Sequence, residues 1–282
     1  MNIPNSLKSY KYPDRPIAKP GYQNVKLVFS FNGQGLNGYQ YQPHGVTIQG
    51  LVQEAWAILT GEKVSLMGCS RLDAGVHAKK YVCNFHASCL GRFTPPKILT
   101  ALNGIMKHTL KQLIAFEECI EVSPDFHARF DSSGKHYQYL LWHGRAENIW
   151  LTPHCWNLKS QVPFLPHVPF QNMVLGTHNF SAFRASDCTS RNPTKTIWKF
   201  DVSAHPHHPE CTIVDVEGSG FLKNMVRNMV GTLVDLGTQK LVWEEVHAAF
   251  VQGNRMAMGQ CAPAHGLSLI NVFYPDSLFH TL

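Results

Sequence analysis

The segment Cys69–Ala78 concentrates side chains that could do chemistry. Within seven residues it holds an arginine, an aspartate, a glycine and a histidine: Arg71, Asp73, Gly75 and His77. A carboxylate in a loop between two strands can be a nucleophile, a general base or simply a turn former. The nearest other acids in the sequence are Glu62 and Glu117, so no local pair of carboxylates predicts glycosidase-like chemistry.

A second segment combines aromatic and basic side chains. Asp125–Phe130 is followed by Lys135–Tyr139, where alternation places Tyr137 and the tyrosine two residues later on one face of a strand. Rings on a sheet, with Arg129 and Lys135 nearby, suit stacking on an unpaired base. Packing within a half-buried sheet explains the same pattern, so both interpretations stay open.

The third segment, Phe221–Gly231, has the apolar spacing of a helix. Lys223 and Arg227 are four residues apart, which predicts that they share one helix face. An arginine at the edge of an apolar stripe can hold a carboxylate in a fixed geometry. The alternative is a pair of solvated cations beside the core.

The sequence lacks the motifs of several other kinds of binding or catalytic site. The glycine-rich turn Phe31–Gly35 has no Gly-Lys-Ser/Thr ending, and no Gly-x-Ser-x-Gly motif is present. The spacing of one His- and Cys-containing segment fits no tetrahedral zinc template, so no metal is expected at His205, His207, His208 and Cys211. The eight cysteines include no Cys-x-x-Cys pair, which favours reduced thiols in a cytoplasmic protein.

Composition and charge narrow the class of protein. The 282 residues are 44% apolar and 16% charged, which predicts a folded chain rather than a disordered one. No apolar stretch approaches the ~18 residues of a membrane helix, and the first residues lack the apolar core of a secretory signal. Residues 1–115 hold 13 Lys and Arg but 4 Asp and Glu, a balance of +9, whereas residues 116–282 balance at −3. The basic half favours a nucleic-acid partner, with a merely solvated surface as the alternative.

Hydrophobic periodicity predicts strands interspersed with helices, without strict alternation of the two. This order indicates an α+β fold with a mainly antiparallel sheet. Residues 1–24, rich in proline, are expected to form a flexible arm before two domains, 25–115 and 116–282. The expected strands are Val25–Phe31, Val64–Cys69, Tyr81–Ala87, Gln112–Glu117, Lys135–Trp142, Thr194–Ala204, Cys211–Val216 and Leu267–Tyr274. The expected helices are 47–61, 95–106, Phe170–Leu175, Gly220–Leu236 and Trp243–Val251, with an extended connection over 144–169.

Four segments together resemble a known family. Ser70–Ala78 resembles the catalytic motif of the TruA family of tRNA pseudouridine synthases, usually written Gly-Arg-Thr-Asp-Ala-Gly-Val-His. Three later parts of the sequence resemble the later motifs of that family and occur in the same order. They are Asp125–Phe130 with Tyr137–Tyr139, Asn179–Arg184 and Met225–Gly231. The resemblance spans residues 25–275.

The resemblance implies a pseudouridine synthase fold, in which two α+β halves flank a central basic cleft, commonly as a homodimer. It implies isomerisation of uridine in tRNA, on the 3′ side of the anticodon stem-loop, without cofactor or metal. Asp73 matches the family nucleophile, Tyr137 the tyrosine that stacks on the flipped base, and Arg227 the arginine that pairs with the nucleophile. The substrate-binding residues expected around them are Arg71, His77, Arg129, Lys135, Arg184 and Lys223.

The sequence departs from the family motifs at several positions. Leu72 replaces the motif threonine and Ser70 replaces the motif glycine, whereas Asp73, Tyr137 and Arg227 are kept. These departures bear on which RNA is used more than on the chemistry. Two alternatives stay open: a catalytically silent tRNA- or RNA-binding protein on the same scaffold, and a hydrolase unrelated to RNA that uses Asp73.

Overall fold

The computed structural model describes residues 20–88, 93–159 and 168–278. The strands are β1 (Gln23–Phe31), β2 (Met67–Gly68), β3 (His77–Ala87), β4 (Ile114–Val122), β5 (Gly134–Trp142), β6 (Trp156–Asn157), β7 (Gly176–Asn179), β8 (Thr194–His205), β9 (His208–Gly218) and β10 (Leu267–Phe273). The helices are α1 (Ile48–Thr60), α2 (Pro95–Gly104, extended by a π-helical segment, Ile105–Leu110), α3 (Val168–Val174), α4 (Met225–Gly237) and α5 (Trp243–Gln252).

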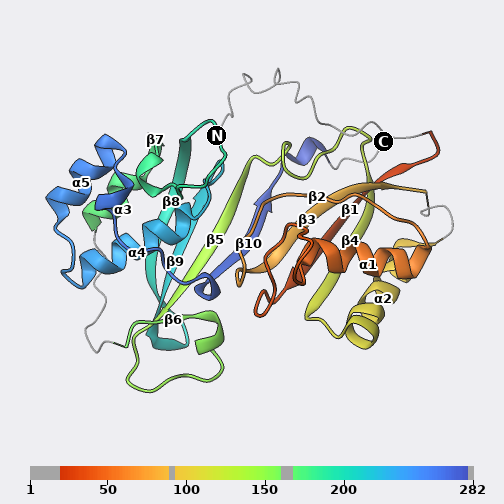
Figure 1. The fold of residues 1–282 in the computed structure, drawn as a ribbon, viewed down its shortest axis with the longest axis horizontal. Helices are drawn as coiled ribbons and strands as arrows, with labels where there is room; N and C mark the ends of the chain where they lie inside the picture. Colours follow the sequence, from red (N-terminus) through yellow and green to blue (C-terminus); the bar gives the residue numbers. More distant parts are fainter. Residues whose placement is uncertain (1–19, 89–92, 160–167, 279–282) are drawn as a thin grey trace.

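The ten strands form one sheet in the order β4-β1-β3-β10-β5-β9-β8-β7, with β2 paired to β3 and β6 paired to β5. Neighbouring strands are antiparallel except for the pairs β10–β3 and β5–β6. In Figure 1, β10 lies between the orange N-terminal strands and the green and blue C-terminal strands. The expected α+β class with a mainly antiparallel sheet is confirmed, and β10 joins its two halves.

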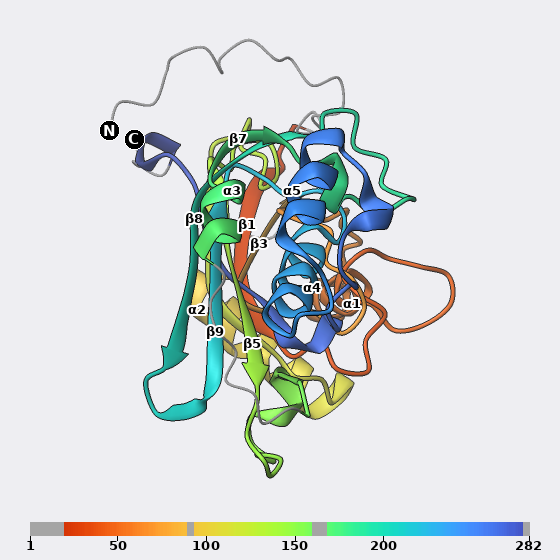
Figure 2. The same cartoon turned by 90° about the vertical axis from the view of Figure 1, so that its left-hand side faces the viewer.

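Helices cover the sheet in two groups. Figure 1 shows α1 and α2 beside the N-terminal strands, and α3, α4 and α5 beside the C-terminal strands. In Figure 2, α4 and α5 lie to one side of β5, β8 and β9. Helix α4 is buried along most of its length and on more than one face, because residues 255–260 also pack against it and contact its buried polar side chains Asn228, Thr232 and Asp235. None of the described helices is long and apolar enough to cross a bilayer.

The first helix forms where its capping residues predict it. The Thr47 hydroxyl accepts a hydrogen bond from the Gly50 amide at 3.2 Å, which satisfies one free donor of the first turn. Gly61 ends the helix with φ +75°, a left-handed conformation that costs glycine little. Trp56 then packs edge-on against Phe85 of β3, with ring centroids 4.6 Å apart.

The prediction of the helix at Gly220–Leu236 was wrong at its start. Helix α4 begins at Met225, because Asn224 has φ +60° and so interrupts a right-handed helix at that residue. Lys223 therefore precedes the helix, and the prediction that it shares a helix face with Arg227 was wrong too.

The boundaries of several other elements differ from those expected from the sequence. The strand expected over Val64–Cys69 is limited to β2, and β3 begins at His77, earlier than expected. Strand β1 begins at Gln23, so the end of the expected arm belongs to the sheet; residues 1–19 lie outside the described part of the chain. The boundary expected between residues 115 and 116 falls inside β4, which pairs with β1.

The connection over 144–169 contains more structure than an extended segment. A short 3-10 turn, Thr152–His154, leads into β6, and α3 begins at Val168; residues 160–167 lie outside the described part. Strand β7, which pairs with β8 at the edge of the sheet, was not expected from the sequence. Its four residues are too few to give a recognisable alternation.

Candidate active site

Asp73 lies in the loop that leads from β2 into β3. The Val76 amide donates to the Asp73 carbonyl at 3.2 Å, and Gly75 has φ +82°, so the chain turns sharply after the aspartate. Leu72 is buried on one side of this turn, while the Asp73 side chain is 29% exposed. The turn therefore presents the carboxylate to solvent from a backbone that is anchored in the core.

The loop is fixed from the other side by the glycine-rich turn after β1. A Cβ atom on Gly33 would lie 2.1 Å from the Val76 carbonyl oxygen, so only glycine allows this approach. The Tyr39 amide donates to the Leu72 carbonyl at 3.0 Å. The sequence marked this turn as glycine-rich, and the structure gives the reason: the turn packs directly against the backbone of the Asp73 loop.

Arg227 pairs with Asp73. Its Nη1 atom donates to Asp73 Oδ2 at 3.2 Å, and the arginine side chain is 17% exposed. Its Nε atom donates to the Ala262 carbonyl at 2.7 Å, and Nη1 also contacts Asn224 Oδ1 at 3.3 Å. A guanidinium held by two further acceptors fixes the position of the carboxylate.

The segment that holds Arg227 is itself packed tightly against α4. The Ala262 amide donates back to the Arg227 carbonyl at 3.2 Å. A Cβ atom on Gly231 would lie 1.7 Å from the Gln260 carbonyl oxygen, so a glycine is required for the approach of residues 260–262. The position of the guanidinium therefore depends on contacts one turn away from it.

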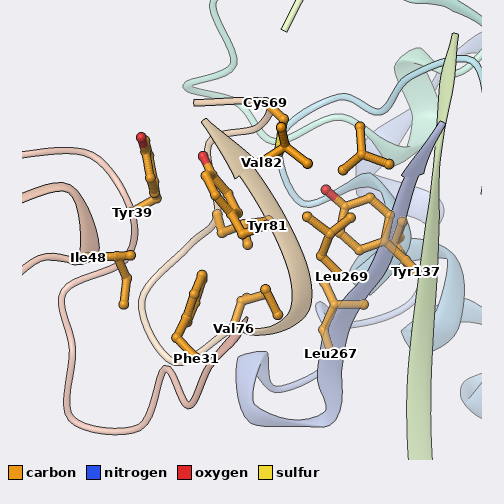
Figure 3. Close-up of a cluster of buried hydrophobic side chains, with 14 of the residues drawn as sticks. Phe31, Tyr39, Ile48, Cys69, Val76, Tyr81, Val82, Tyr137, Leu267 and Leu269 are labelled. Atoms are coloured by element: carbon orange, nitrogen blue, oxygen red, sulfur yellow. The ribbon is translucent and has the colours of Figure 1, made fainter. Parts of the chain in front are cut away.

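Tyr137 lies in β5, buried to 4% exposure, with its hydroxyl 3.1 Å from the Ser70 Oγ atom. Figure 3 shows its oxygen directed away from β5, towards the part of the cluster that contains Cys69 and Val82. The Phe221 ring contacts Tyr137 edge-on, with centroids 5.0 Å apart. Burial raises the pKa of Tyr137 well above its usual range, so the hydroxyl stays protonated at neutral pH. A loop, a helix and a strand that are distant in sequence thus bring a carboxylate, a guanidinium and a phenol to one region.

Comparison with known proteins shows the family to which this chain belongs. A tRNA pseudouridine synthase family model matches residues 172–275. The chain is 37% identical to tRNA pseudouridine synthase A of Citrifermentans bemidjiense over 90% of this chain and 98% of that protein. It is 34% identical to tRNA pseudouridine synthase A of Geotalea uraniireducens and 35% identical to that of Acetivibrio thermocellus, each over 89% of this chain and the whole of the relative.

The chain belongs to the TruA family of tRNA pseudouridine synthases. The resemblance read from the four motifs is therefore confirmed. The family model covers two of them, Asn179–Arg184 and Met225–Gly231, and Arg227 lies within the second.

His77, the last polar residue of the TruA-like motif, is buried to 4% exposure beneath the loop. Its Nδ1 atom accepts from the Gly33 amide at 3.0 Å, so the ring proton is on Nε2, which donates to the His265 carbonyl at 3.1 Å. Burial, and next the nearby His154 ring, lower the pKa of His77 to about 4. The neutral ring therefore connects the loop to two other turns and has both nitrogens in use.

Three other residues expected to bind the substrate of a TruA-like enzyme differ in exposure. Arg71 and Arg129 are exposed, and the Arg129 guanidinium lies 5.4 Å from the centroid of the Phe130 ring. Lys135 is 8% exposed, donates to Ser132 Oγ at 3.4 Å and has a pKa lowered by burial. The two arginines are available to a phosphate, whereas the lysine lies below the surface.

The last two expected residues contact the loop around Asp187. Arg184 donates from Nη2 to the Cys188 carbonyl, and Lys223 forms an ion pair with the exposed Asp187 carboxylate. Hydrogen bonding within the pair raises the pKa of Lys223 and lowers that of Asp187. The Asp73 charge also contributes to the raised pKa of Lys223, which places this ion pair near the Asp73 loop.

Sequence reasoning missed three contributors to the site. The Ala262 contact uses a backbone carbonyl, so the residue type does not predict it. Asn224 lies within the helix expected from the sequence, but it precedes α4, at a helix start where asparagine is favoured. Ser70 was noted as a departure from the motif, but the contact of its hydroxyl with Tyr137 could not be read from spacing. Within the described residues, no group of three or more His, Cys, Asp or Glu side chains is arranged to hold a metal ion.

Proposed function

We propose that this chain isomerises uridine to pseudouridine in tRNA, with Asp73 as the nucleophile. The observation that carries the proposal is the Asp73–Arg227 ion pair, with Tyr137 in the same region, in a chain whose relatives are named tRNA pseudouridine synthase A. In this reaction the N1–C1′ bond of uridine breaks and a C5–C1′ bond forms. C5 loses a proton and N1 gains one, so neither a redox step nor a hydrolysis is required.

Asp73 would attack the nucleotide, at the base or at the ribose, and form a covalent intermediate. Two features support this role. The Arg227 guanidinium holds the carboxylate in a fixed position, and the aspartate side chain is partly exposed, so a nucleotide can reach it. A covalent bond holds one fragment while the uracil turns, which allows C5 to replace N1 opposite C1′.

Tyr137 would contact the uracil during this step. Because its burial favours the protonated phenol, it acts as a ring to pack against the base and as a hydroxyl that donates a hydrogen bond, not as a standing phenolate. A phenol that stays protonated does not accept the C5 proton, so we assign Tyr137 no proton-transfer step.

The RNA would be held mainly through its phosphates. The target uridine must leave its stack at a cost of a few kcal/mol, which phosphate contacts elsewhere offset. Arg71, exposed two residues before Asp73, can occupy the vacated stack or contact a phosphate. The exposed Arg129 and the basic charge of residues 1–115 support such binding. We place the target on the 3′ side of the anticodon stem-loop, as the family resemblance implies.

Location and assembly complete the proposal. A cytoplasmic enzyme is supported by the cysteines of the described residues, all seven of which are free thiols. A homodimer follows from the family resemblance; light scattering on the purified protein tests it, because a dimer has twice the 31.7 kDa chain mass.

The experiment compares wild type, Asp73→Asn and, as a control, Asp201→Asn, which changes an exposed aspartate of β8. Each protein is incubated with an unmodified tRNA transcript, and pseudouridines are mapped. Wild type and the control should form pseudouridine, and Asp73→Asn should bind tRNA without forming product. Binding without product by wild type would favour the catalytically silent RNA-binding alternative, and equal turnover by Asp73→Asn would remove Asp73 from the mechanism.

A further inference from the structure

Ser70 lies three residues before Asp73, and its backbone is held in place. The Cys69 amide before it donates to the Val82 carbonyl at 2.9 Å. The Ser70 carbonyl accepts a hydrogen bond from the Tyr81 hydroxyl. The Ser70 amide donates to the oxygen of that hydroxyl at 3.4 Å. Because both backbone groups of Ser70 contact β3 through one phenol, the direction of its side chain is constrained.

The phenol that holds Ser70 is itself immobilised. Tyr81 is fully buried, and its ring stacks on Tyr39 with centroids 4.5 Å apart and planes 25° apart. A Cβ atom on Gly68 would lie 2.3 Å from the Tyr81 hydroxyl oxygen, so the start of this loop passes directly over the tyrosine pair. Figure 3 shows Tyr39, Tyr81 and Cys69 in the same buried cluster as Tyr137.

The Ser70 hydroxyl is directed at Tyr137. The two oxygens are 3.1 Å apart, and either hydroxyl can donate. Tyr137 is 4% exposed, so water has little access and a protein partner is needed to satisfy its hydroxyl. Strands β3 and β5 do not pair with each other, because β10 lies between them. The contact therefore links the catalytic loop to the strand of the tyrosine across the sheet.

We propose that Ser70 is a positioning residue for the isomerisation, which acts by orienting the Tyr137 hydroxyl relative to Asp73. The proposal rests on the function and the role of Tyr137 proposed above. The TruA-like motif has glycine at this position, which supplies no oxygen, so the hydrogen bond is a feature of this chain rather than of the motif. It compensates within the protein for burial of the phenol, and it fixes the O–H direction before RNA binds.

The test uses Ser70→Ala, which removes the hydroxyl, and Ser70→Thr, which keeps it. Ser65→Ala, at an exposed serine five residues earlier, is the matched control. Steady-state rates are measured as release of tritium from tRNA labelled at uridine C5. Ser70→Ala should lower kcat about tenfold with KM within about twofold, the effect of one lost hydrogen bond. Ser70→Thr and Ser65→Ala should stay within about threefold of wild type. An unchanged kcat in Ser70→Ala, or an equal loss in Ser70→Ala and Ser70→Thr, would overturn the proposal.

A measurement independent of activity keeps the two proposals apart. Thermal midpoints of Ser70→Ala, Tyr137→Phe and the double variant form a cycle; if the hydroxyls interact, the double variant should lose less than the two single losses added together. Additive losses would show that the hydroxyls do not interact, and would overturn the role of Ser70 while leaving that of Asp73 intact. Absence of product from wild type would instead defeat the proposed function. If Ser70→Ala folds poorly, Ser70→Gly, the residue of the motif, replaces it with the same expected loss in kcat.

Discussion

The Arg227 Nη1 atom lies 3.2 Å from Asp73 Oδ2, although 154 positions separate the two residues in the chain. The arginine enters this contact from the first turn of α4, while the aspartate comes from the loop before β3. The segment of residues 260–262 also holds the guanidinium, because the Ala262 carbonyl accepts a hydrogen bond from Arg227 Nε. The pair is thus assembled from three separate stretches of sequence, and each offers a way to perturb it.

Arg227→Lys should lower the rate of pseudouridine formation by about 100-fold or more. A lysine keeps the charge, but it cannot donate at once to Asp73, to the Ala262 carbonyl and to Asn224 in the fixed geometry of a guanidinium. Single-turnover rates with saturating enzyme check this, and Arg191→Lys, at an exposed arginine, is the control. A rate equal to that of wild type would show that charge alone suffices.

Gly231→Ala should both destabilise the fold and slow the reaction. The added Cβ would lie 1.7 Å from the Gln260 carbonyl, so residues 260–262 must move away from α4 and take the Ala262 acceptor of Arg227 with them. We expect a loss of about 2 kcal/mol in the free energy of unfolding. Urea denaturation and turnover together measure the effect.

Gly104→Ala is the matched control for that substitution. Gly104 ends α2, has right-handed helical φ and ψ, and has nothing within 4 Å of an added Cβ. Its replacement should raise the free energy of unfolding by about 0.5 to 1 kcal/mol and leave turnover unchanged. Equal losses in the two variants would contradict the packing argument at Gly231.

The stability of the protein should fall below neutral pH through His77. The pKa of this buried histidine in the fold is about 4, below its ordinary value of 6.5, so folding favours the neutral ring. This contribution to the free energy of unfolding is complete above pH 6.5 and is lost as the pH falls through about 4, with a size of about 3 kcal/mol.

His77→Gln isolates that contribution. The amide can accept from the Gly33 amide and donate to the His265 carbonyl, but it does not titrate. Free energies of unfolding measured by urea between pH 7 and pH 4 should therefore decline less steeply in the variant than in wild type. His108→Gln, at an exposed histidine, should keep the wild-type slope. Parallel curves for wild type and His77→Gln would remove His77 as the cause.

Asp187→Asn should tighten tRNA binding, by about threefold at low salt. The change removes a negative charge near the Asp73 loop and releases Lys223 from its ion pair, so the lysine can contact a phosphate. Lys223→Ala should weaken binding and reduce the slope of log affinity against log salt by about one. Filter binding over a series of salt concentrations measures both, with Asp201→Asn as the control. Weaker binding by Asp187→Asn would show that the pair organises the surface rather than blocking a cation.

Features governed by short-range rules were predicted well from the sequence. Helix α1 followed from a threonine cap, apolar spacing and a closing glycine, all within fifteen residues. The composition and the order of four motifs also sufficed to indicate the family, because motif recognition needs residue types and spacing but no coordinates.

The sequence by itself therefore determined which residue types the site contains: Asp73 in a glycine-bearing loop, Tyr137 on a strand and Arg227 beside an apolar stripe. Tertiary structure alone decided their neighbours. The left-handed backbone at Asn224 removed Lys223 from the helix, the approach of residue 265 buried His77, and the passage of the loop over Tyr81 directed Ser70 at Tyr137. The reason is that hydrogen bonds have a range of a few ångströms, whereas their partners here lie 11 to 188 positions apart, so sheet register and loop packing determine which groups meet.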